Sequence, residues 1–535
     1  ASTNTFNGFT NNTMLKYKKQ IGNNHLFTST TGFNIMTNKF QYDWGIAKNA
    51  HENDEYRMLA DGIDNLREIG GENRNWNWAS LYEKVTYAFQ DRYLLSGTVS
   101  LDASSRIGKD AINTIKLLGN PFGLFYSTGL GWRVSNESFL DDIAWLEELK
   151  IRASYGRTGN DDIGEANASN FLQTVHYRST SGVIPATIPN NYLSYETVDK
   201  LNTGIDLALL GNRVRVNFDL YNTNVSNMLL YIPLEAYIGY DFRPENNGKM
   251  QNRGWDLYAF VRIVNSRNFK WDVEATLSSV NNEVTEIEND KFVTTLNSYE
   301  LVNQVGEAAN SFYGYNFLGV YQTTEEALAA NLVNDKGVAY RAGDAKYEDV
   351  SGPAGTPDGM INDFDKMVIG NPFPEMIGGL TNTFKYRNFT LSAFVNFVSG
   401  NEVFNYLRYK NESMTDLHNQ STYTLNRWQY EGQQTDVPRA MWNDPVGNSD
   451  FSTRWIEDGS YLRLKNVSLS YRIPNEFLAF KYAEFYISAT NLLTLSNYLG
   501  YDPEFSNSFS ILDQGIDYGQ SPHPRQFLVG IKIGL

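Results

Sequence analysis

The residues that decide the fold are Glu83 to Asp102, which read EKVTYAFQDRYLLSGTVSLD. Apolar residues alternate with small or polar ones from Val85 to Phe89 and, after a short turn, again from Tyr93 to Leu101. Successive side chains of a β-strand point to opposite faces of the sheet. The stretch therefore predicts two antiparallel strands of about ten residues each, apolar on one face only.

The same alternation recurs along the rest of the chain. Further strand pairs are centred on the turns at 210–213, 266–268 and 387–388. The alternation of Phe527 to Leu535 predicts a last strand, and with weaker segments we expect about 14 to 16 strands in all. Helical patterns are few. Asp141 to Leu149 is compatible with one or two turns, and Thr324 to Asn331 begins like a capped helix.

The connections between these strands fall into two length classes that alternate along the chain. The short ones are the turns at 90–92, 210–213, 266–268 and 387–388. The long ones are polar stretches rich in Asn and Gly, at about 104–122, 159–199, 227–250, 281–311, 320–375, 401–460 and 496–524. Outer-membrane barrels have short periplasmic turns and long extracellular loops, so we predict an all-β fold, an antiparallel transmembrane β-barrel. A large soluble β-protein is the alternative, although its usual short strands and regular blade repeats are not evident.

Composition and charge exclude several other classes of protein. The chain of 535 residues has 45 Lys and Arg against 61 Asp and Glu, and its net charge of −16 argues against binding to nucleic acid or to acidic lipid. The absence of cysteine excludes disulfide frameworks, zinc–thiolate sites, iron–sulfur clusters and thiol catalysis. No apolar run approaches the roughly 18 residues of a membrane helix. The first residues contain no secretory signal, so we expect a mature form or a fragment, and the location stays open.

Catalytic motifs are not evident in the sequence. The five histidines are scattered and form no H-E-x-x-H motif: His25, His51, His176, His418 and His523. No G-x-S-x-G elbow and no glycine-rich phosphate loop occurs. Neighbouring carboxylates in the long stretches are typical of solvated acidic loops. We therefore expect that the protein is not an enzyme.

One acidic loop, residues 344–365, has the character of a cation site. Asp349, Asp358 and Asp365 are its candidate ligands, with Gly359 at a sharp turn. Hard cations bind carboxylate and carbonyl oxygens arranged around such a turn, so Ca²⁺ (or Mg²⁺) is the candidate ion. Residues 353–357 interrupt the motif and leave Asp349 in doubt as the first ligand. The alternative is an Asp–Gly turn with solvated acids, and we expect no other cofactor.

Aromatic residues in the long connections are candidates for contact with a substrate or a partner. They are Tyr231, Tyr237, Tyr240, Tyr313, Tyr315, Phe317, Tyr406 and Trp428. Such side chains could stack on sugar rings or peptide side chains. They could equally pack one loop against another, and aromatics at strand ends more often form the interfacial girdle.

Several stretches, in order along most of the chain, resemble the SusC/RagA family of TonB-dependent outer-membrane transporters from Bacteroidota. They are SSRIG at Ser104–Gly108, GLGWRVS at Gly129–Ser135, LKIRASYGRTGN at Leu149–Asn160, YLRLKNVSLSY at Tyr461–Tyr471, ATNLL at Ala489–Leu493, GYDPE at Gly500–Glu504 and Pro524–Arg525. One position departs from the pattern, since Ile107 stands where the family more often has an aromatic residue.

The resemblance implies that residues 1–535 are the C-terminal part of a larger barrel. Proteins of the family are about twice as long, and a plug and a TonB-contacting segment precede a barrel of 22 strands. Nothing in this sequence matches the plug or the TonB-contacting segment. An open sheet edge cannot lie in lipid because its backbone groups would be unsatisfied, so we expect another stretch of polypeptide to supply the remaining strands.

The function implied by the resemblance is TonB-energised import of oligosaccharides or oligopeptides across the outer membrane of a Gram-negative bacterium. The implied partners are a SusD/RagB-like surface lipoprotein, the TonB system, outer-membrane lipid, and the N-terminal barrel and plug segment of the same protein. Two alternatives remain open: a passive porin or structural outer-membrane barrel, and a secreted glycan-binding β-protein. The sequence does not distinguish sugar cargo from peptide cargo.

Overall fold

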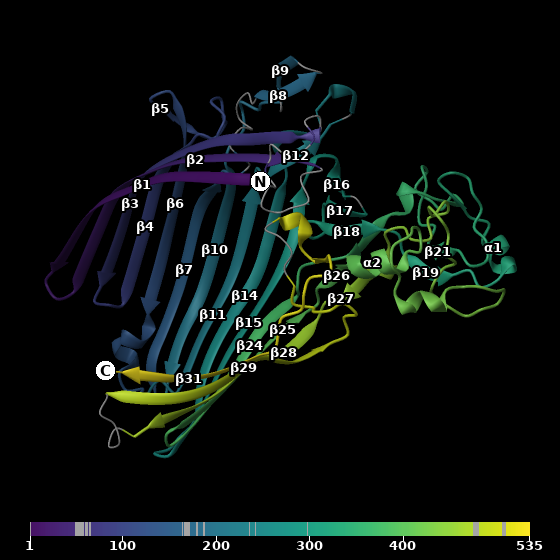
Figure 1. Cartoon of the computed structure of the whole chain (residues 1–535). Helices are drawn as coiled ribbons and strands as arrows, with labels where there is room; N and C mark the ends of the chain where they lie inside the picture. Colours follow the sequence, from purple (N-terminus) through teal and green to yellow (C-terminus); the bar gives the residue numbers. More distant parts are fainter. Residues whose placement is uncertain are drawn as a thin grey trace. The chain divides into compact units, whose positions relative to one another are not determined.

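The computed structural model consists mostly of antiparallel strands with a few short helices (Figure 1). It describes residues 2–48, 58, 63, 66–162, 164, 172–177, 180–185, 188–234, 236–240, 242–296, 298–474, 481–505 and 510–534. Among these residues, no helix is long and apolar enough to cross a membrane. The chain divides into two compact units, which are described separately.

The first unit comprises residues 1–143, 148–204 and 221–250. Its strands are hydrogen-bonded in the order β1-β2-β3-β4-β6-β7-β10-β11, and β5 pairs with β6. Their bounds are β1 Ser2–Ile21, β2 His25–Ile46, β3 Glu68–Phe89, β4 Tyr93–Ser104, β5 Ile115–Leu117, β6 Asn120–Arg133, β7 Leu146–Asn160, β10 Glu196–Leu209 and β11 Val214–Ser226. The unit also contains the short 3-10 helices η4 Val134–Asn136, η5 Ser138–Leu140 and η6 Ala236–Ile238. In two further hairpins, β8 Leu172–Tyr177 pairs with β9 Thr180–Pro185, and β12 Leu229–Pro233 pairs with β13 Phe242–Asn246.

The second unit comprises residues 144–147, 205–220 and 251–535, so β7, β10, β11 and β14 contribute residues to both units. Its main strands follow the order β10-β11-β14-β15-β24-β25-β28-β29-β31. The bounds not yet given are β14 Lys249–Asn265, β15 Phe269–Glu286, β24 Met376–Tyr386, β25 Phe389–Ser399, β28 Tyr461–Ile473, β29 Tyr482–Ser496 and β31 Gln526–Gly534.

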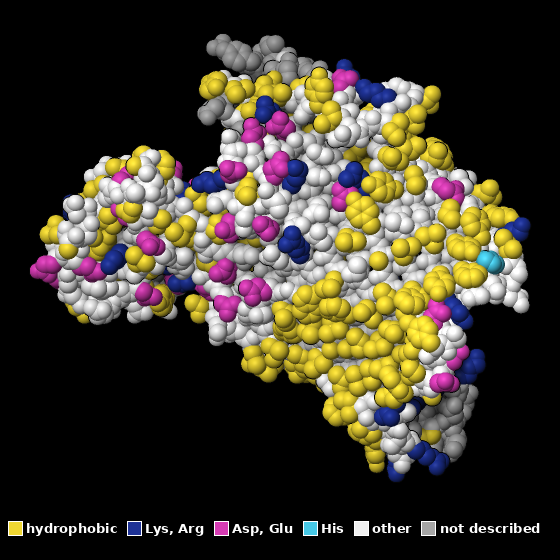
Figure 2. Space-filling model, turned by 180° about the vertical axis from the view of Figure 1, so that it is seen from behind, with side chains coloured by type: hydrophobic (Ala, Val, Ile, Leu, Met, Phe, Trp, Pro, Cys, Tyr) yellow, Lys and Arg dark blue, Asp and Glu magenta, His cyan; other side chains and the backbone are white. Residues whose placement is uncertain are grey.

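Each sheet has one apolar face and one polar face, as the alternation predicts. In the first unit, Leu95 lies opposite Leu130, whereas the next pair along the strands is Ser96 and Gly129. Directly opposite residues of antiparallel strands share a face, so the apolar side chains collect on one side. Many of them are exposed, among them Leu95, Val99, Leu130, Ile151 and Leu201 in the first unit and Ile263, Leu380, Leu391, Leu469 and Ile487 in the second. Figure 2 shows hydrophobic side chains gathered in one continuous area bordered by polar ones.

The last strand follows the same rule. Ile531 lies opposite Phe485, and the adjacent Lys532 lies opposite Glu484. The ammonium group of Lys532 lies 5.0 Å from the centroid of the Tyr486 ring, on the polar face. The predicted separation of the isoleucine and the lysine onto opposite faces is therefore confirmed.

Short and long connections alternate along the strand order, so in each unit the long connections share one end of the sheet. The long connections that follow strands of the main sheets are 47–67, 105–119, 161–195, 227–248, 287–375, 400–460 and 497–525. The prediction placed two separate loops at 281–311 and 320–375. That division was wrong, because β15 extends to Glu286 and residues 287–375 form a single insertion before β24.

Two other local predictions have different outcomes. The helix at Asp141 to Leu149 is not formed, since β7 begins at Leu146 and the carbonyl of Trp145 accepts a hydrogen bond from the backbone N–H of Leu210 at 2.8 Å. The helix at Thr324 is confirmed as α1 (Thr324–Ala330), and the side chain of Thr323 accepts a hydrogen bond from the backbone N–H of Glu326 at its N-terminus. Strands β1, β2 and β3 have 20, 22 and 22 residues, about twice the predicted length.

Residues 287–375, 400–460 and 497–525 of the second unit form what we call the loop domain. It contains the small sheets β16-β17-β18-β23, β19-β21, β20-β22 and β27-β26-β30. Their bounds are β16 Lys291–Leu296, β17 Tyr299–Gln304, β18 Ser311–Gly314, β19 Phe317–Val320, β20 Val333–Asn334, β21 Ala345–Tyr347, β22 Met360–Ile361, β23 Met367–Gly370, β26 Glu402–Asn405, β27 Ile456–Asp458 and β30 Ile516–Asp517. Its helices are α1, α2 Tyr406–Glu412, η7 Glu288–Asp290, η8 Asp363–Asp365, η9 Thr422–Asn426, η10 Thr453–Trp455 and η12 Ile511–Asp513.

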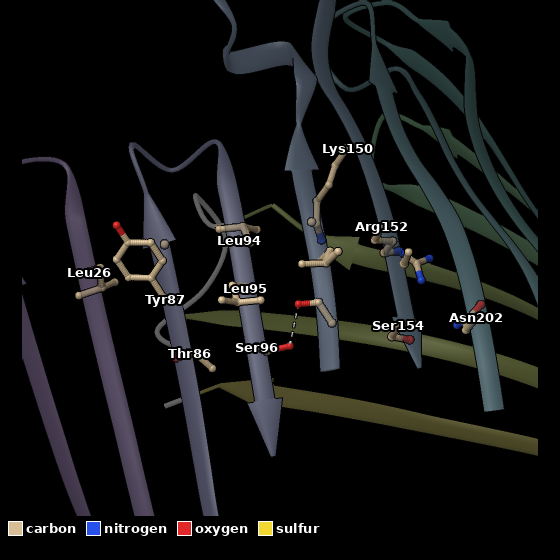
Figure 3. A pocket seen from close by; sticks show the side chains of 15 residues that line it. Leu26, Thr86, Tyr87, Leu94, Leu95, Ser96, Lys150, Arg152, Ser154 and Asn202 are labelled. Atoms are coloured by element: carbon tan, nitrogen blue, oxygen red, sulfur yellow. Dashed lines mark hydrogen bonds between the residues drawn. The ribbon is translucent and has the colours of Figure 1, made fainter. Parts of the chain in front are cut away.

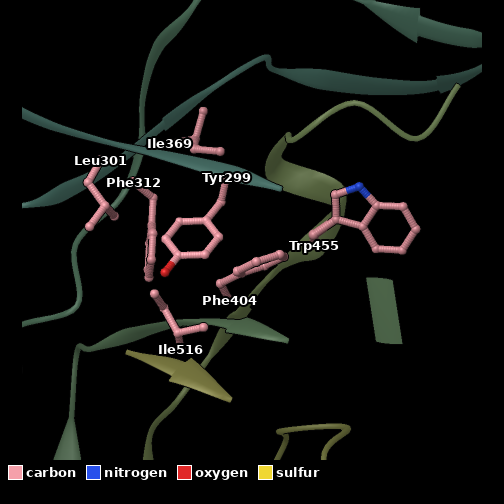
Figure 4. Close-up of a cluster of buried hydrophobic side chains, with 7 residues drawn as sticks. All are labelled: Tyr299, Leu301, Phe312, Ile369, Phe404, Trp455 and Ile516. Carbon is pink, nitrogen blue, oxygen red and sulfur yellow. The ribbon is translucent and has the colours of Figure 1, made fainter. Parts of the chain in front are cut away.

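The loop domain has a hydrophobic core to which all three of its segments contribute (Figure 4). The core residues are Tyr299, Leu301, Phe312, Ile369, Phe404, Trp455 and Ile516. Phe404, Trp455 and Ile516 are completely buried. The long connections thus fold together by burying apolar surface, as the core of a soluble domain does.

Candidate functional site

The polar face of the first unit contains a hollow of about 340 Å³ near the end of the sheet that has the short turns (Figure 3). Glycines on β6 leave the space for it. A Cβ atom added to Gly129 would lie 2.7 Å from the hydroxyl oxygen of Ser96, whose side chain donates a hydrogen bond to the Gly129 carbonyl at 3.4 Å. The side chains around it include Thr86, Leu94, Ser96, Lys150, Arg152, Ser154 and Asn202.

This first hollow offers hydroxyl, amide and cationic groups to whatever lies against the wall. Lys150, Arg152 and Ser154 all come from β7, and Figure 3 shows Arg152 between the other two along the strand. Such groups bind carboxylates and backbone carbonyls of polypeptide as readily as sugar hydroxyls. We call the main-sheet strands of both units the strand wall. This first hollow is a contact surface on it that does not discriminate between peptide and sugar ligands.

The polar face of the second unit is acidic, and its carboxylates are held by neighbouring strands. Ser278 donates to Asp256 at 2.5 Å, and the hydroxyl of Tyr258 donates to Glu274. Nearer the short turn between β14 and β15, Arg262 pairs with Asp272 at 2.7 Å. A second hollow, of about 440 Å³, lies on this face between β11, β14, β15, β24 and β25.

A buried ion pair joins two segments of the loop domain. Asp344 is completely buried, and Arg439 donates to its two carboxylate oxygens at 2.7 and 3.1 Å. Asn448 donates to the same carboxylate at 3.1 Å. Asp344 belongs to the segment 287–375 and its partners to the segment 400–460, so the pair fixes one long connection on the other. Separating Asp344 from Arg439 would leave a buried carboxylate without its partner, which would cost several kcal/mol of folding free energy, so the two segments stay together.

A second ionic cluster attaches the segment 497–525 to β28. Arg463 pairs with Asp502, and the backbone N–H of His523 donates to Asp502 at 2.9 Å. Burial alone would raise the pKa of Asp502, but hydrogen bonds from Arg463 and from the backbone N–H groups of His523 and Glu504 lower it to about 2. The carboxylate is therefore charged at all physiological pH values.

The three predicted cation ligands lie in one loop, but each accepts hydrogen bonds from the backbone. Asp365 is buried and accepts from the N–H groups of Val350 at 2.8 Å and Asn362 at 2.9 Å. Asp349 accepts from Gly359 at 2.8 Å and Asp358 from Met360 at 3.0 Å. No group of three His, Asp or Glu side chains suited to a metal occurs in the part of the chain that the structure describes. These contacts account for the three carboxylates, and a cation in loop 344–365 stays a prediction.

Most of the predicted aromatic contacts are packed inside the loop domain. Tyr313 and Tyr315 are buried, and Trp428 donates from Nε1 to the carbonyl of Gln322 at 3.1 Å. The Tyr406 ring lies 5.0 Å from that of Tyr518. Aromatic packing between loops, rather than an open binding face, is the arrangement that these residues adopt.

The remaining predicted aromatics differ in exposure. Phe317 is half-buried, with its ring 6.1 Å from that of Tyr347. Tyr237 is 87% exposed, Tyr231 is exposed beside the Phe242 ring at 4.7 Å, and Tyr240 is half-buried. Of the eight candidates, Tyr231 and Tyr237 are the exposed ones that could meet a ligand or a partner without rearrangement.

Sequence reasoning missed several exposed apolar side chains of the loop domain. They are Leu417, Leu425, Tyr430 and Trp442. A single apolar residue in a polar loop can be a buried anchor or an exposed contact, so no signal in the sequence distinguishes these four. The acidic groups of the second hollow were detectable in part, because the alternation of β11 already placed Asp219 on the polar face.

Comparison with known proteins identifies relatives along nearly the whole chain. The family model "TonB dependent receptor-like, beta-barrel" matches residues 1–492. A TonB-dependent receptor of Formosa agariphila is 29% identical over 99% of this chain and 52% of its own length. The TonB-dependent receptor SusC of Bacteroides thetaiotaomicron is 26% identical over 85% of this chain and 43% of its own length.

Solved structures give the same fold. The structure of the RagAB peptide transporter superimposes with a TM-score of 0.80 at 24% identity, covering 99% of this chain and 56% of that one. The chain thus spans about half the length of the relatives it matches.

Proposed function

Because the chain belongs to the TonB-dependent receptor-like β-barrel family, we propose that it forms barrel wall and extracellular loops of an importer for oligosaccharides or oligopeptides. Its cargo would be too large for passive diffusion through a porin. Import would be energised by TonB acting on a plug supplied by another part of the protein. A surface lipoprotein of the SusD/RagB kind would cover the extracellular mouth.

Family membership settles three simpler points. The protein is located in the outer membrane, its relatives are from Bacteroidota, and it is a transporter component and not an enzyme. The alternative of a secreted glycan-binding protein is therefore wrong. What the complete transporter carries, and with which partners, is part of the proposal.

The observation that carries the proposal is the loop domain. Long connections usually either serve a function or lack order. Here three of them share a core and a buried ion pair, Asp344 with Arg439. A passive channel does not require connections with a shared core, whereas a lid that opens and closes would need an ordered surface on which to dock. This favours a lidded importer over a passive porin.

The names of the relatives do not choose between the two proposed cargo classes. The RagAB structure is named as that of a peptide transporter, and the SusC relative is named as a receptor. The polar face of the first unit carries groups that bind either class. We therefore keep oligosaccharides and oligopeptides together as the proposed cargo.

Uptake by intact cells tests the proposal. We expect cells with the complete gene to take up labelled oligosaccharides or oligopeptides, and uptake to cease when TonB is depleted. Mild detergent extraction should also yield a lipoprotein in near-equal amount with the barrel. Uptake that continues without TonB, together with recovery of the barrel alone, would favour the passive porin.

A further inference from the structure

The second hollow, on the acidic polar face of the second unit, has the features of a ligand site. It is about 440 Å³ in volume and is formed by side chains of β11, β14, β15, β24 and β25. A hollow of this size holds one or two rings of a ligand. It lies in the wall, apart from the loop domain and from the eight aromatic residues considered above.

The ring of Phe394 forms part of this hollow. Phe394 on β25 extends over Gly379 on β24, where a Cβ atom would lie only 2.8 Å from Cε2 of the ring. The same Cβ atom would lie 3.2 Å from the hydroxyl oxygen of Thr276. The glycine therefore leaves room for the phenylalanine ring, which a larger side chain at position 379 would displace.

Hydrogen-bonding groups surround this ring, and acceptors predominate among them. Asp256 comes from β14, and Thr276 and Ser278 come from β15. Asn396 donates from its amide to the hydroxyl of Tyr461 at 3.4 Å, which orients the amide beside the ring. Asn217 and Asp219 from β11 complete the polar lining. No Lys, Arg or His is among the described residues that form the hollow.

We propose that this hollow is a binding subsite for an uncharged sugar ring on the path of the cargo, an inference that rests on the proposed import function. The apolar C–H face of the sugar would stack on Phe394. Its hydroxyl groups would donate to Asp256 and accept from Thr276. Such a combination of one flat apolar surface and a few oriented polar groups gives a pocket its orientation and specificity.

The charge of the hollow argues against other cargo. Asp256 would repel a sulfated or carboxylated sugar, and the described residues of the lining include no Lys, Arg or His. A peptide presents a terminal carboxylate and backbone carbonyls, which need donors that this lining supplies only through hydroxyls and amides. A neutral sugar matches both the stacking surface and the excess of acceptors.

Affinity measurements on the complete purified transporter test this subsite. The probes are short neutral gluco-, manno- and xylo-oligosaccharides, a sulfated counterpart of each, and a mixed peptide digest. For Phe394→Leu, which removes the ring but keeps an apolar side chain, we expect binding of a neutral oligosaccharide to weaken about tenfold. The matched control is Phe260→Leu on β14, whose ring contacts Arg215 at 4.5 Å outside the hollow and whose loss should leave affinity unchanged.

A second variant tests the charge separately from the ring. Asp256→Asn keeps the shape of the side chain and removes its charge. We expect the ratio of the affinity for neutral sugar to the affinity for sulfated sugar to fall in this variant. Glu484→Gln on β29, a charge change outside the hollow, should leave the preference as it is. The amount of each variant in the outer membrane shows that folding is intact.

The outcomes separate this inference from the proposed function. Equal sugar affinity in Phe394→Leu and Phe260→Leu, or no binding of any neutral sugar, would overturn the subsite. TonB-dependent uptake of peptides alone would also overturn it but would leave the importer proposal standing. Uptake of neither class by cells with the complete gene would instead contradict the proposed function itself.

Discussion

The strand wall and the loop domain bury their apolar residues in opposite ways. On the wall, Ile531 is 59% exposed and its neighbour Lys532 lies on the polar face. In the loop domain, Phe404 and Trp455 are completely buried. The difference shows that one chain can place its apolar side chains in two ways. In strands that face lipid they alternate with polar ones and point outward, and in segments that face water they cluster in a buried core.

Charged residues differ between the two regions as well. On the wall, pairs such as Arg262 with Asp272 lie along the polar face between neighbouring strands. In the loop domain, Asp344 with Arg439 joins segments far apart in the sequence. Ion pairs of the wall therefore lie along a surface. Those of the loop domain hold together long connections whose strands are too short to fix their fold alone.

The largest effect that we expect is in the loop-domain core. Trp455→Ala should destabilise this domain by about 3–5 kcal/mol, because it removes a completely buried indole and leaves a cavity. Limited proteolysis of the complete protein should then cut residues 287–375 and 400–460, while the wall stays assembled. Trp442→Ala is the matched control, since that side chain is 61% exposed and its loss should leave the loops protected. Equal proteolysis of both variants would show that the domain lacks a core of the kind described.

The apolar face of the wall should respond to charge rather than to lost volume. Ile531→Arg should cost about 2–4 kcal/mol if the side chain lies near the middle of the membrane. Leu528→Thr changes the polar face, where Leu528 lies opposite Ser488, and should cost much less. The measurement is the fraction of protein assembled in the outer membrane. Similar assembly of the two variants would contradict the assignment of the faces.

A smaller effect should follow from pH. The pKa of Asp502 is lowered to about 2 from 3.8, so its contribution to stability is complete above pH 4 and is lost as the pH falls toward 2. The loss should be about 2 kcal/mol, because one unit of pKa corresponds to roughly 1.4 kcal/mol. Proteolysis of the segment 497–525 by an acid protease, measured across this range, should accelerate as the pH falls. For Asp502→Asn, the rate should depend less on pH.

The sequence predicted the existence of the main strands better than it predicted where the sheet begins and where single strands start. Alternation is clear from Glu83 onward because one face is consistently apolar, and the register confirms it at Leu95 and Leu130. Strands β1 and β2 were missed because they are rich in Thr and Asn, and the pattern there is too weak to mark a strand. The helix expected at Asp141 to Leu149 is not formed because β7 begins at Leu146 and the backbone just before it bonds to Leu210, a long-range contact that no local pattern contains.

The loop domain could not be predicted from local pattern. Its core combines residues such as Phe312, Phe404 and Ile516 from three connections that two strand pairs separate. Aromatic residues such as Tyr315 were therefore read as possible ligand contacts although they are buried. For the carboxylates of loop 344–365, the sequence showed the right residue types. It did not show that backbone N–H groups would engage all three of them.

The most direct test of the account is the labelling of single cysteines in intact cells, because the chain itself contains no cysteine. One cysteine replaces Leu425, exposed in the loop domain, and another replaces Arg387, in the short turn between β24 and β25. The remainder of the complete protein is freed of cysteine. We predict that a membrane-impermeant maleimide labels Leu425→Cys in intact cells and Arg387→Cys only after the outer membrane is opened. Labelling of Arg387→Cys in intact cells would contradict the assignment of the loop domain to the outside and of the short turns to the periplasm.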